Sequence, residues 1–460
     1  MARVVVIGGG PAGSVFAARM AGLGHSVHLI ERAEFPRPRL GESLSPGVPD
    51  LLKVAGAGHV PQASGANPVS SVLIDWDGPA ILRDMRGAGG LTVNRGAFDA
   101  ELLRHACEAG VELLQPARLM STQRVSGRWK LRIAGPEGDM TLTADFMAIA
   151  TGRSGGRGAK RLYAQHKTIS LYGYWDLPGA VPGPQLRAGP DGWFWGVPLP
   201  CGLYNTLIFA DPSELRKRPG RDTANRLRHM LSGYGQDDTL QGARLRGQPG
   251  ATDATPYLDT EVIGPGMIRL GDAALAIDPV SSSGVQKSVQ GALAGAICAN
   301  TLLRRPQDAA LAMAFYRDTL SRTSQRHEEW ASGYYHTVAE RFPGSFWTPR
   351  AGPPVPEPPP VAGARELSTG ILRLAPELDV TDKATLDAEY VVSRPTVTHP
   401  AFDGPVTYLS GVELAPLIRR FPGNKNGLQI ADDWSDAVPV RTGMAILAWL
   451  LNHGGAEHVP

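Results

Sequence analysis

The chain begins with a pattern that leaves little choice of fold: a short strand, a glycine-rich turn and a helix. A strand is expected at Arg3–Ile7, of which residues 4–7 are apolar, and it runs into Gly8-Gly-Gly10-Pro-Ala12-Gly13, after which an Ala-rich helix is expected to Leu23. In such a unit the first glycine permits a tight turn, the second lets the backbone approach a pyrophosphate, and the third lets the helix pack on the strand. The pattern therefore predicts a doubly wound α/β domain that binds a dinucleotide.

The second strand of this unit supports the prediction. Residues 26–30 are expected to be extended and to end at Glu31, eighteen residues after Gly13. A ribose-binding carboxylate is expected roughly 20 residues after the glycines. Alone, these features do not distinguish FAD from NAD.

Two later segments narrow the choice of cofactor. Residues 148–150 form an apolar strand that ends in a turn at Gly152, and residues 267–270 form another that runs into Gly271-Asp272. Asp278-Pro279 follows, and then a serine-rich loop that opens a helix at Ser283-Gly284-Val285. The N-terminus of such a helix carries a partial positive charge, which would stabilise negative charge on a bound ligand.

These segments together resemble the FAD-dependent aromatic hydroxylases and their relatives, the flavin-dependent halogenases and geranylgeranyl reductases. The resemblance implies that Asp272 binds the ribityl or pyrophosphate part of FAD. It also implies that Ser283, Gly284 and Val285 lie along the flavin edge.

Further segments resemble the same families. Gly41-Glu42-Ser43 follows the basic Arg37-Pro-Arg39, in the position of the Gly-Glu-Ser segment of halogenases. Arg95 begins a segment that resembles the Arg-x-x-Phe-Asp helix start of these families, in which the arginine contacts FAD, so Arg95 is expected to do the same. Residues 117–119 resemble the strand that holds the adenine. The expected FAD-binding residues are therefore Gly8, Gly10, Ala12, Gly13, Glu31, Arg32, Arg39, Glu42, Ser43, Arg95, Leu119, Gly152, Asp272, Ser283, Gly284 and Val285.

The rest of the chain predicts a four-part organisation. Residues 1–155 alternate strand and helix patterns, and long helices are expected at 284–304 and 309–338, so 1–165 and 260–345 are assigned to the FAD-binding domain. Aromatic and β-branched strands at 168–176, 192–199 and 204–211 place an antiparallel substrate domain at 166–259.

A proline-rich linker at 350–363 precedes a small α+β domain at 364–460, with helices at 411–420 and 440–453. A winged-helix-like arrangement is one alternative for this last domain.

Composition excludes some functions. The net charge of +2 provides no electrostatic footprint for nucleic acid. The three cysteines lie far apart, so no zinc spacing or other metal site is expected. No apolar stretch is long enough for a membrane span, and the N-terminus does not resemble a signal peptide, so a cytoplasmic protein is expected.

The chemistry of the halogenases and that of the hydroxylases make different demands on the chain. Gly-Trp193-Phe-Trp195-Gly-Val-Pro resembles the Trp-x-Trp-x-Ile-Pro motif of halogenases, although an aromatic strand face explains it as well. Halogenases also carry a lysine roughly thirty residues after the Gly-Glu-Ser-like segment. From Val54 to Trp129 this chain has no lysine.

The absence of this lysine favours oxygenation over halogenation. A reduced flavin adds O₂ at C4a, and the resulting hydroperoxide delivers oxygen to an electron-rich ring, while the protein supplies position, dryness and proton handling. His166, Tyr174 and Asp278 are weak candidates for the proton-handling residue, and the sequence does not choose among them.

One subgroup of this superfamily also lacks the lysine and carries an appended C-terminal domain: the flavoprotein monooxygenases that mature tryptophylquinone cofactors, such as that of quinohemoprotein amine dehydrogenase. The resemblance implies a tryptophan within a partner polypeptide as substrate, with NADH, NADPH or an external reductase as electron source. A halogenase, a geranylgeranyl-reductase-like enzyme and a non-catalytic flavin-loaded maturation factor remain alternatives.

Overall fold

The computed structural model describes residues 1–156, 158–217, 222–354 and 364–459. These residues divide into two compact units: most of residues 1–354 belong to the first, and residues 364–459 to the second. Within the described residues, no helix combines the length and the apolar character needed to cross a membrane.

A six-stranded sheet forms the centre of the first unit. Five of its strands run parallel, and β20 pairs antiparallel with its neighbour at one edge. Val4, Val5 and Val6 of β1 are fully buried, as expected for a parallel sheet that is covered on both faces. The strand order is β20 (Ile263–Gly264), β21 (Met267–Arg269), β12 (Phe146–Ile149), β1 (Arg3–Ile7), β2 (Ser26–Ile30) and β8 (Glu112–Leu114). The predicted α/β class is confirmed.

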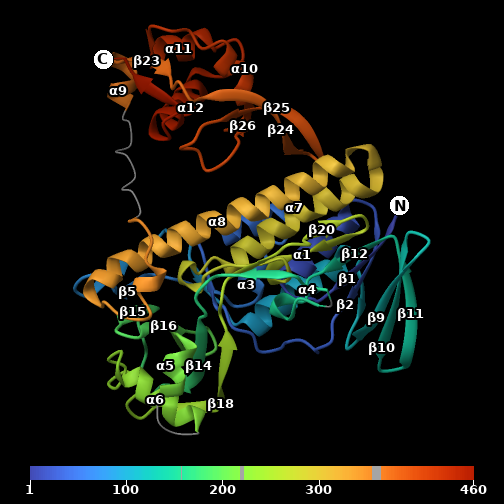
Figure 1. Cartoon of the computed structure of the whole chain (residues 1–460), viewed down its shortest axis with the longest axis vertical. Coiled ribbons are helices and arrows are strands. Elements are labelled where there is room, and N and C mark those ends of the chain that lie inside the picture. The colour runs from blue at the N-terminus through green and yellow to red at the C-terminus, as the bar shows by residue number, and fades with distance from the viewer. Residues whose placement is uncertain (157, 218–221, 355–363, 460) are drawn as a thin grey trace. The chain divides into compact units, whose positions relative to one another are not determined.

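Helices cover one face of this sheet. Helix α1 (Pro11–Gly22) packs between α4 (Arg95–Glu108) and α7 (Gly284–Arg304), as Figure 1 shows. The bounds of α7 agree with the predicted 284–304, and α8 (Ala309–Arg341) runs three residues beyond the predicted end at 338.

The other face of the six-stranded sheet is covered by an antiparallel sheet, which the sequence did not predict. The strand and helix alternation was expected to continue to about residue 155, but residues 118–144 form an antiparallel meander instead: β9 (Arg118–Val125), β10 (Arg128–Gly135) and β11 (Gly138–Ala144). Its apolar side, with Leu131 and Ile133, packs against Val5 and Ile7 of β1. The meander stands at one side of the unit in Figure 1.

A seven-stranded sheet forms the predicted substrate region, but it is wider than 166–259. Two strands from residues 71–84 join its edge, because β5 pairs in parallel with β15. The predicted bounds of 166–259 missed this hairpin, since pairing between strands more than 100 residues apart leaves no local signal. The order is β18 (Arg244–Asp253), β14 (Ile169–Asp176), β17 (Leu203–Ala210), β16 (Gly192–Pro198), β15 (Gln185–Gly189), β5 (Ser71–Asp75) and β6 (Ile81–Asp84).

The second unit is the small α+β domain that the sequence predicts beyond the proline-rich segment. Its apolar core includes the fully buried Trp434 and Ile446. The predicted helices at 411–420 and 440–453 correspond to α10 and α12, and residues 355–363 of the predicted linker lie outside the described residues. The elements are α9 (Ala364–Thr369), β23 (Ile371–Leu374), β24 (Asp379–Asp387), β25 (Tyr390–Thr398), β26 (Tyr408–Leu409), β27 (Val412–Glu413), α10 (Leu414–Arg419), β28 (Lys425–Asn426), α11 (Gly427–Asp433), α12 (Val440–Asn452) and β29 (Ala456–His458). The winged-helix-like alternative stays a prediction.

Candidate functional site

A cavity of about 690 Å³ opens in the first unit, within the usual size range of ligand pockets. The glycine-rich turn, the segment 37–43 and the loop before α7 line it on one side. The face of the seven-stranded sheet lines it on the other. The cavity therefore joins the predicted dinucleotide site to the predicted substrate region.

The glycine-rich turn has the geometry that its sequence predicts. Gly8 has φ +105°, and a Cβ on Gly13 would lie 1.9 Å from the Gly8 carbonyl oxygen, so α1 packs against the turn only with glycine there. Gly10 faces the cavity, and the nearest atom to an added Cβ is Arg37 Nη2 at 3.6 Å. The backbone of Gly10 is therefore open to a ligand, as a phosphate-binding turn requires.

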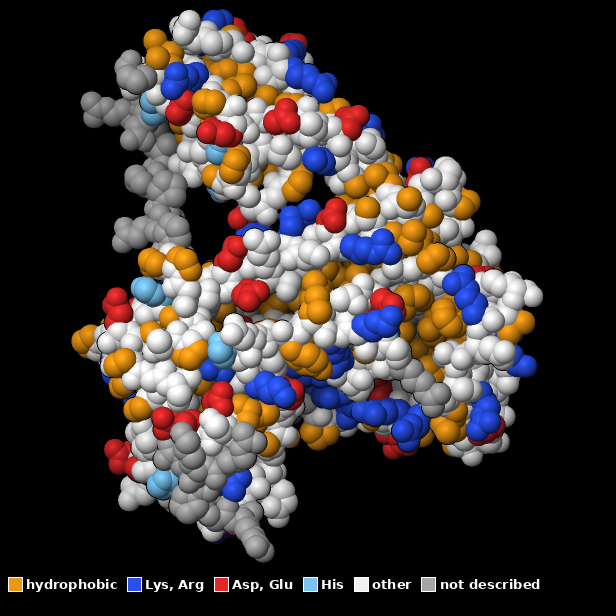
Figure 2. All heavy atoms as spheres, in the orientation of Figure 1, with side chains coloured by type: hydrophobic (Ala, Val, Ile, Leu, Met, Phe, Trp, Pro, Cys, Tyr) orange, Lys and Arg blue, Asp and Glu red, His pale blue; other side chains and the backbone are white. Residues whose placement is uncertain are grey.

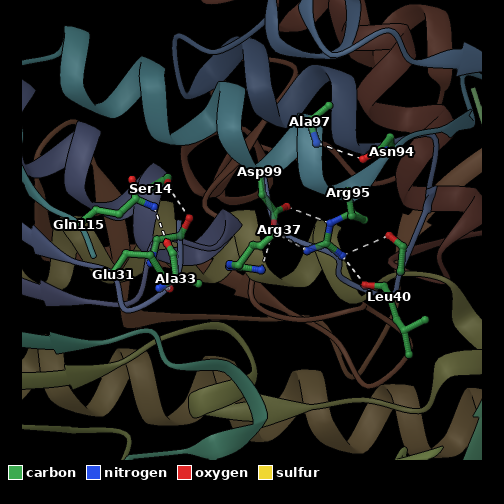
Figure 3. Close-up of polar contacts among 12 residues, drawn as sticks. Ser14, Glu31, Ala33, Arg37, Leu40, Asn94, Arg95, Ala97, Asp99 and Gln115 are labelled. Atoms are coloured by element: carbon green, nitrogen blue, oxygen red, sulfur yellow. Dashed lines mark hydrogen bonds and ion pairs between the residues drawn. The ribbon is translucent and has the colours of Figure 1, made fainter. Parts of the chain in front are cut away.

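Glu31 is buried at the end of β2 and lines the cavity. Its Oε2 accepts a hydrogen bond from the Gly9 N–H at 2.7 Å, and its Oε1 accepts one from the Ala33 N–H at 2.9 Å (Figure 3). The carboxylate thus joins the glycine-rich turn to the segment that follows β2. Arg32 and Leu119 line the same part of the cavity.

Arg95, expected to contact FAD, anchors a neighbouring segment. Its Nε donates to Asp99 Oδ1 at 2.9 Å, and its Nη1 donates to the carbonyl of Leu40 at 2.7 Å and to that of Gly41 (Figure 3). Arg37 Nη1 lies 3.5 Å from the other oxygen of Asp99. The fully buried Asp99 therefore holds the 37–41 segment against the first turn of α4, while Arg95 also lines the cavity.

The loop before α7 carries the second predicted cluster. Asp272 lines the cavity, and Lys287 Nζ donates to its Oδ1 at 2.7 Å. Burial raises the pKa of Asp272, but the charges of Lys287 and Arg153 outweigh that effect and hold the pKa below its ordinary value. Gly284 and Val285 line the cavity as expected. The Ser283 hydroxyl instead donates to the Ser281 carbonyl at 2.9 Å.

The lining residues fit FAD. Ser43 Oγ and Thr151 Oγ1 are buried beside the cavity without a hydrogen-bond partner in the described residues, and a buried polar atom of this kind calls for a polar ligand. Lys and Arg side chains gather on this face of the first unit, below the positions of α4 and β2 (Figure 2). The arginines in the cavity lining are Arg32, Arg37, Arg39, Arg95, Arg118 and Arg153, and they favour an anionic pyrophosphate.

Glu42 points toward the substrate side of the cavity, although its segment was assigned to FAD. Its Oε1 accepts hydrogen bonds from the Tyr174 hydroxyl at 2.6 Å and from Asn205 Nδ2 at 3.1 Å. Its Oε2 accepts one from the Gly41 N–H at 2.8 Å. Burial raises the pKa of Glu42 above its ordinary value, and these hydrogen bonds and the charge of Arg95 offset only part of the effect. Glu42 is therefore a buried acid between the two halves of the cavity.

Aromatic side chains form the wall on the substrate side. Trp193 and Trp195 lie two residues apart on β16 and both line the cavity, whereas Phe194 between them packs into the core on the other face. The ring of Trp193 stacks on Phe209 with a centroid distance of 3.9 Å. Tyr172 of β14 completes an apolar wall suited to an aromatic substrate.

The three weak proton-handling candidates lie in different environments. Asp278 lines the cavity, where the Tyr335 hydroxyl donates to its Oδ1 at 2.8 Å, and burial raises its pKa. Tyr174 reaches the site through Glu42, and burial raises its pKa far above the ordinary value. His166 is not among the residues that line the cavity within the described chain.

Two residues that contribute to the site could not be identified from sequence patterns. Asn205 lies in a β-strand with no motif, and Tyr335 lies near the end of a long helix. They contact Glu42 and Asp278 from positions 163 and 57 residues away. Asp99 was visible in the Arg-x-x-Phe-Asp pattern, but its role in holding the 37–41 segment was not.

Comparisons with known proteins agree with this site. A family model described as tryptophan halogenase matches residues 90–362, and one described as pyridine nucleotide-disulphide oxidoreductase matches residues 3–57. The tryptophan 2-halogenase of Chondromyces crocatus is 30% identical over 370 residues, which cover 75% of this chain and 70% of that protein. The flavin-dependent halogenase armH4 of Armillaria mellea is 27% identical and covers 66% of each chain.

Two solved structures are similar over nearly the whole chain. The flavin-dependent halogenase CmlS superposes with a TM-score of 0.81 at 19% identity, covering 99% of this chain and 96% of its own, which shows a shared fold. QhpG, described as a peptidyl tryptophan dihydroxylase essential for tryptophylquinone cofactor biogenesis, superposes with a TM-score of 0.75. It is 27% identical and covers 98% of this chain and 99% of its own.

Proposed function

We propose a function from one premise: this chain belongs to the tryptophan halogenase family of flavin-dependent enzymes, and its cofactor is FAD. Our proposal is that it inserts oxygen into an electron-rich aromatic ring, and that its substrate is a tryptophan side chain of a partner polypeptide. Reduced flavin would come from an external reductase or from transient reduction by NADH or NADPH.

The observation that carries the oxygenase proposal is the missing lysine. The position about thirty residues after Gly41-Glu42-Ser43 falls on β5, which reads Ser-Val-Leu-Ile-Asp. No lysine lines the cavity within the described residues, and Lys287 is buried in contact with Asp272 and the Leu275 carbonyl. Without an amine to hold a hypohalous acid, direct transfer of oxygen to the substrate is the chemistry best suited to this cavity.

The proposed substrate rests on two observations. The likeness to QhpG extends over the C-terminal domain as well as the core, at an identity above that of CmlS. The cavity wall of Tyr172, Trp193 and Trp195 offers stacking surface for an indole.

When bound, reduced FAD supplies the activated oxygen, and the residues of the chain hold and protect the substrate. Trp193 and Phe209 form a dry aromatic wall. Glu42 and Asp278, whose pKa values burial raises, line the cavity as two carboxyl groups able to exchange a proton with a developing oxyanion or to take up a departing ring proton.

Halogenation is the second candidate, and specific observations favour it. The matched family model and the relatives in Chondromyces and Armillaria are named as halogenases. Both tryptophans of the Trp-x-Trp pattern also face the cavity, as in a wall between flavin and substrate chambers. A halogenase without the family lysine would need another group to position the halogenating species.

One experiment separates the candidates. The purified protein is supplied with FAD, NADH, a flavin reductase, bromide and heavy-isotope O₂, together with a tryptophan-containing peptide and, separately, free tryptophan. Mass spectrometry of the products then follows. We expect one or two heavy oxygen atoms in the peptide and no bromine.

A matched reaction without bromide should give the same oxygenated product at the same rate. Bromine in either substrate would replace the oxygenase proposal with halogenation. Heavy oxygen in free tryptophan but not in the peptide would support oxygen insertion as the reaction and would rule out the proposed polypeptide substrate.

A further inference from the structure

Two histidines and a glutamate meet on the surface of the first unit, and none of the three lines the cavity. His59 lies in the turn between α2 (Val48–Val54) and α3 (Val60–Ala63), and it faces His105 and Glu108 of α4. One ligand atom of each residue lies within 4.8 Å of the other two. The imidazole rings approach edge to face, with their centroids 5.5 Å apart.

The backbone beneath these side chains is anchored in the core. Ala57 and Val60, which flank His59, are fully buried, and so is Ala106, which follows His105. The Ala57 N–H also donates to the Leu52 carbonyl at 2.7 Å and closes the turn after α2. The positions of the two histidines are therefore set by packing, while their rings remain at the surface.

Local geometry also leaves room for a shared ligand. His105 and Glu108 are three residues apart on α4, so they lie on the same face of the helix. Gly56 has φ +74°, and a Cβ there would lie 3.7 Å from His105 Cε1, so the turn passes close to the ring without crowding it. Within the described residues, no hydrogen bond occupies either imidazole.

We propose that His59, His105 and Glu108 bind a late first-row divalent metal ion, with Zn²⁺ as the defining case. Two imidazoles, one carboxylate and a water molecule form a common ligand set for zinc. Tetrahedral bonds of about 2.1 Å place neighbouring ligand atoms about 3.4 Å apart. Rotation of the exposed Glu108 side chain and a small movement of the rings would bring the atoms from their present separations to that distance.

One existing contact competes with the metal. Arg104 Nη1 donates to Glu108 Oε1, but Arg104 also donates to Glu101 Oε2 through Nη2 at 2.7 Å. Both Arg104 and Glu108 are about half exposed, and an exposed pair of this kind contributes little to stability. Arg104 therefore keeps a partner when Glu108 turns to the metal.

The test uses the full-length protein without a histidine tag, titrated with ZnCl₂ by calorimetry in a buffer that does not bind metal. We expect one Zn²⁺ per chain and a higher melting temperature in its presence, because binding stabilises the folded state by mass action. His105→Gln and His59→Gln should each weaken binding by at least about tenfold, since even changes outside the ligand shell cost about 10–100-fold.

His336→Gln is the matched control. His336 is a partly exposed histidine 3.9 Å from Glu340, and no second histidine joins this pair among the described residues, so removing it should leave Zn²⁺ binding unchanged. FAD binding should be unchanged in all three variants and reports that they fold. Absence of Zn²⁺ binding at 100 µM, a concentration about 100-fold above a micromolar Kd, would overturn the proposal. Binding that persists in His59→Gln and His105→Gln would overturn it as well.

Discussion

The two sides of the cavity are built from contacts of very different sequence range. On the cofactor side, the glycine-rich turn is built from close neighbours: Gly13 packs on Gly8, and Glu31 binds Gly9 22 residues away. Arg95 binds Asp99 four residues away and also reaches Leu40 across 55 residues. On the substrate side, Glu42 binds Tyr174 and Asn205 across 132 and 163 residues.

The two sides of the cavity also differ in the physical effect that a substitution would disturb. On the cofactor side, Gly8 and Gly13 tolerate no added Cβ, and the arginines of the cavity lining carry positive charge that favours a pyrophosphate. The substrate side keeps two buried carboxyl groups, Glu42 and Asp278, and burial raises the pKa of both. Changes on the first side should therefore affect cofactor binding and folding, and changes on the second side should affect turnover and pH dependence.

The largest expected effect is on turnover. Glu42→Gln keeps the size of the side chain but removes its capacity to take up and release a proton, so we expect oxygenation to fall by about 100-fold or more, the lower range for loss of a general acid or base. FAD affinity should change little. Product formation under saturating reduced flavin and a flavin titration are the measurements.

Glu31→Gln is the paired variant on the cofactor side. Its carboxylate accepts two backbone hydrogen bonds at the glycine-rich turn, so its loss should weaken FAD binding and leave turnover at saturating FAD nearly normal. If Glu42→Gln instead lost FAD and kept its turnover, Glu42 would belong to the cofactor side and the comparison would be wrong.

The next effect is on stability. Gly13→Ala places a Cβ 1.9 Å from the Gly8 carbonyl oxygen, and we expect a loss of about 3 kcal/mol, the upper part of the usual range for overpacking, together with loss of bound FAD. Denaturant unfolding and the flavin content of the purified protein measure this.

Gly22→Ala is its control on the same helix. Outside its own helix backbone and chain neighbours, no atom of the described residues lies within 4 Å of an added Cβ at Gly22, so the stability should stay within about 0.5 kcal/mol of the parent protein. An equal loss of stability in both variants would show that α1 is sensitive to an added methyl group along its length, and not only where it packs against the glycine-rich turn.

The smallest effect concerns Asp278. Tyr335→Phe removes the hydroxyl that donates to its carboxyl, and we expect a stability loss of about 1–2 kcal/mol near neutral pH. Tyr334→Phe, in which the neighbouring and more exposed ring changes, should cost less than about 0.5 kcal/mol. Thermal unfolding of both variants gives the comparison.

The same variant has a defined pH dependence. A carboxyl group whose folded pKa is raised binds more protons in the folded state, so its stabilising effect is present below the ordinary carboxyl pKa of 3.8 and is lost as the pH rises through the raised value. The Tyr335 hydrogen bond lowers the Asp278 pKa, so Tyr335→Phe should extend this loss to higher pH. If the pH dependence of stability were unchanged in Tyr335→Phe, the Tyr335 hydroxyl would not influence the pKa of Asp278.

Much of the cofactor side could be predicted. The turn Gly8–Gly13, the end of β2 at Glu31 and the bounds of α7 all follow from glycine sterics, short apolar runs and helical periodicity. The shared orientation of Trp193 and Trp195 follows from the two-residue repeat of a strand. The residues expected to contact FAD stay predictions, although the structure brings most of them to one cavity.

The dinucleotide unit and the absence of the lysine can be recognised without the folded structure, because both depend on residue identity at short spacing. Four other features became visible only in the folded chain: the direction of the Glu42 side chain, the pairing of β5 and β6 with the substrate sheet, the contact of Tyr335 with Asp278, and that of His59 with His105. Each of these depends on which distant surfaces bury one another, and a buried carboxyl or a strand edge finds its partner only when the whole chain has folded.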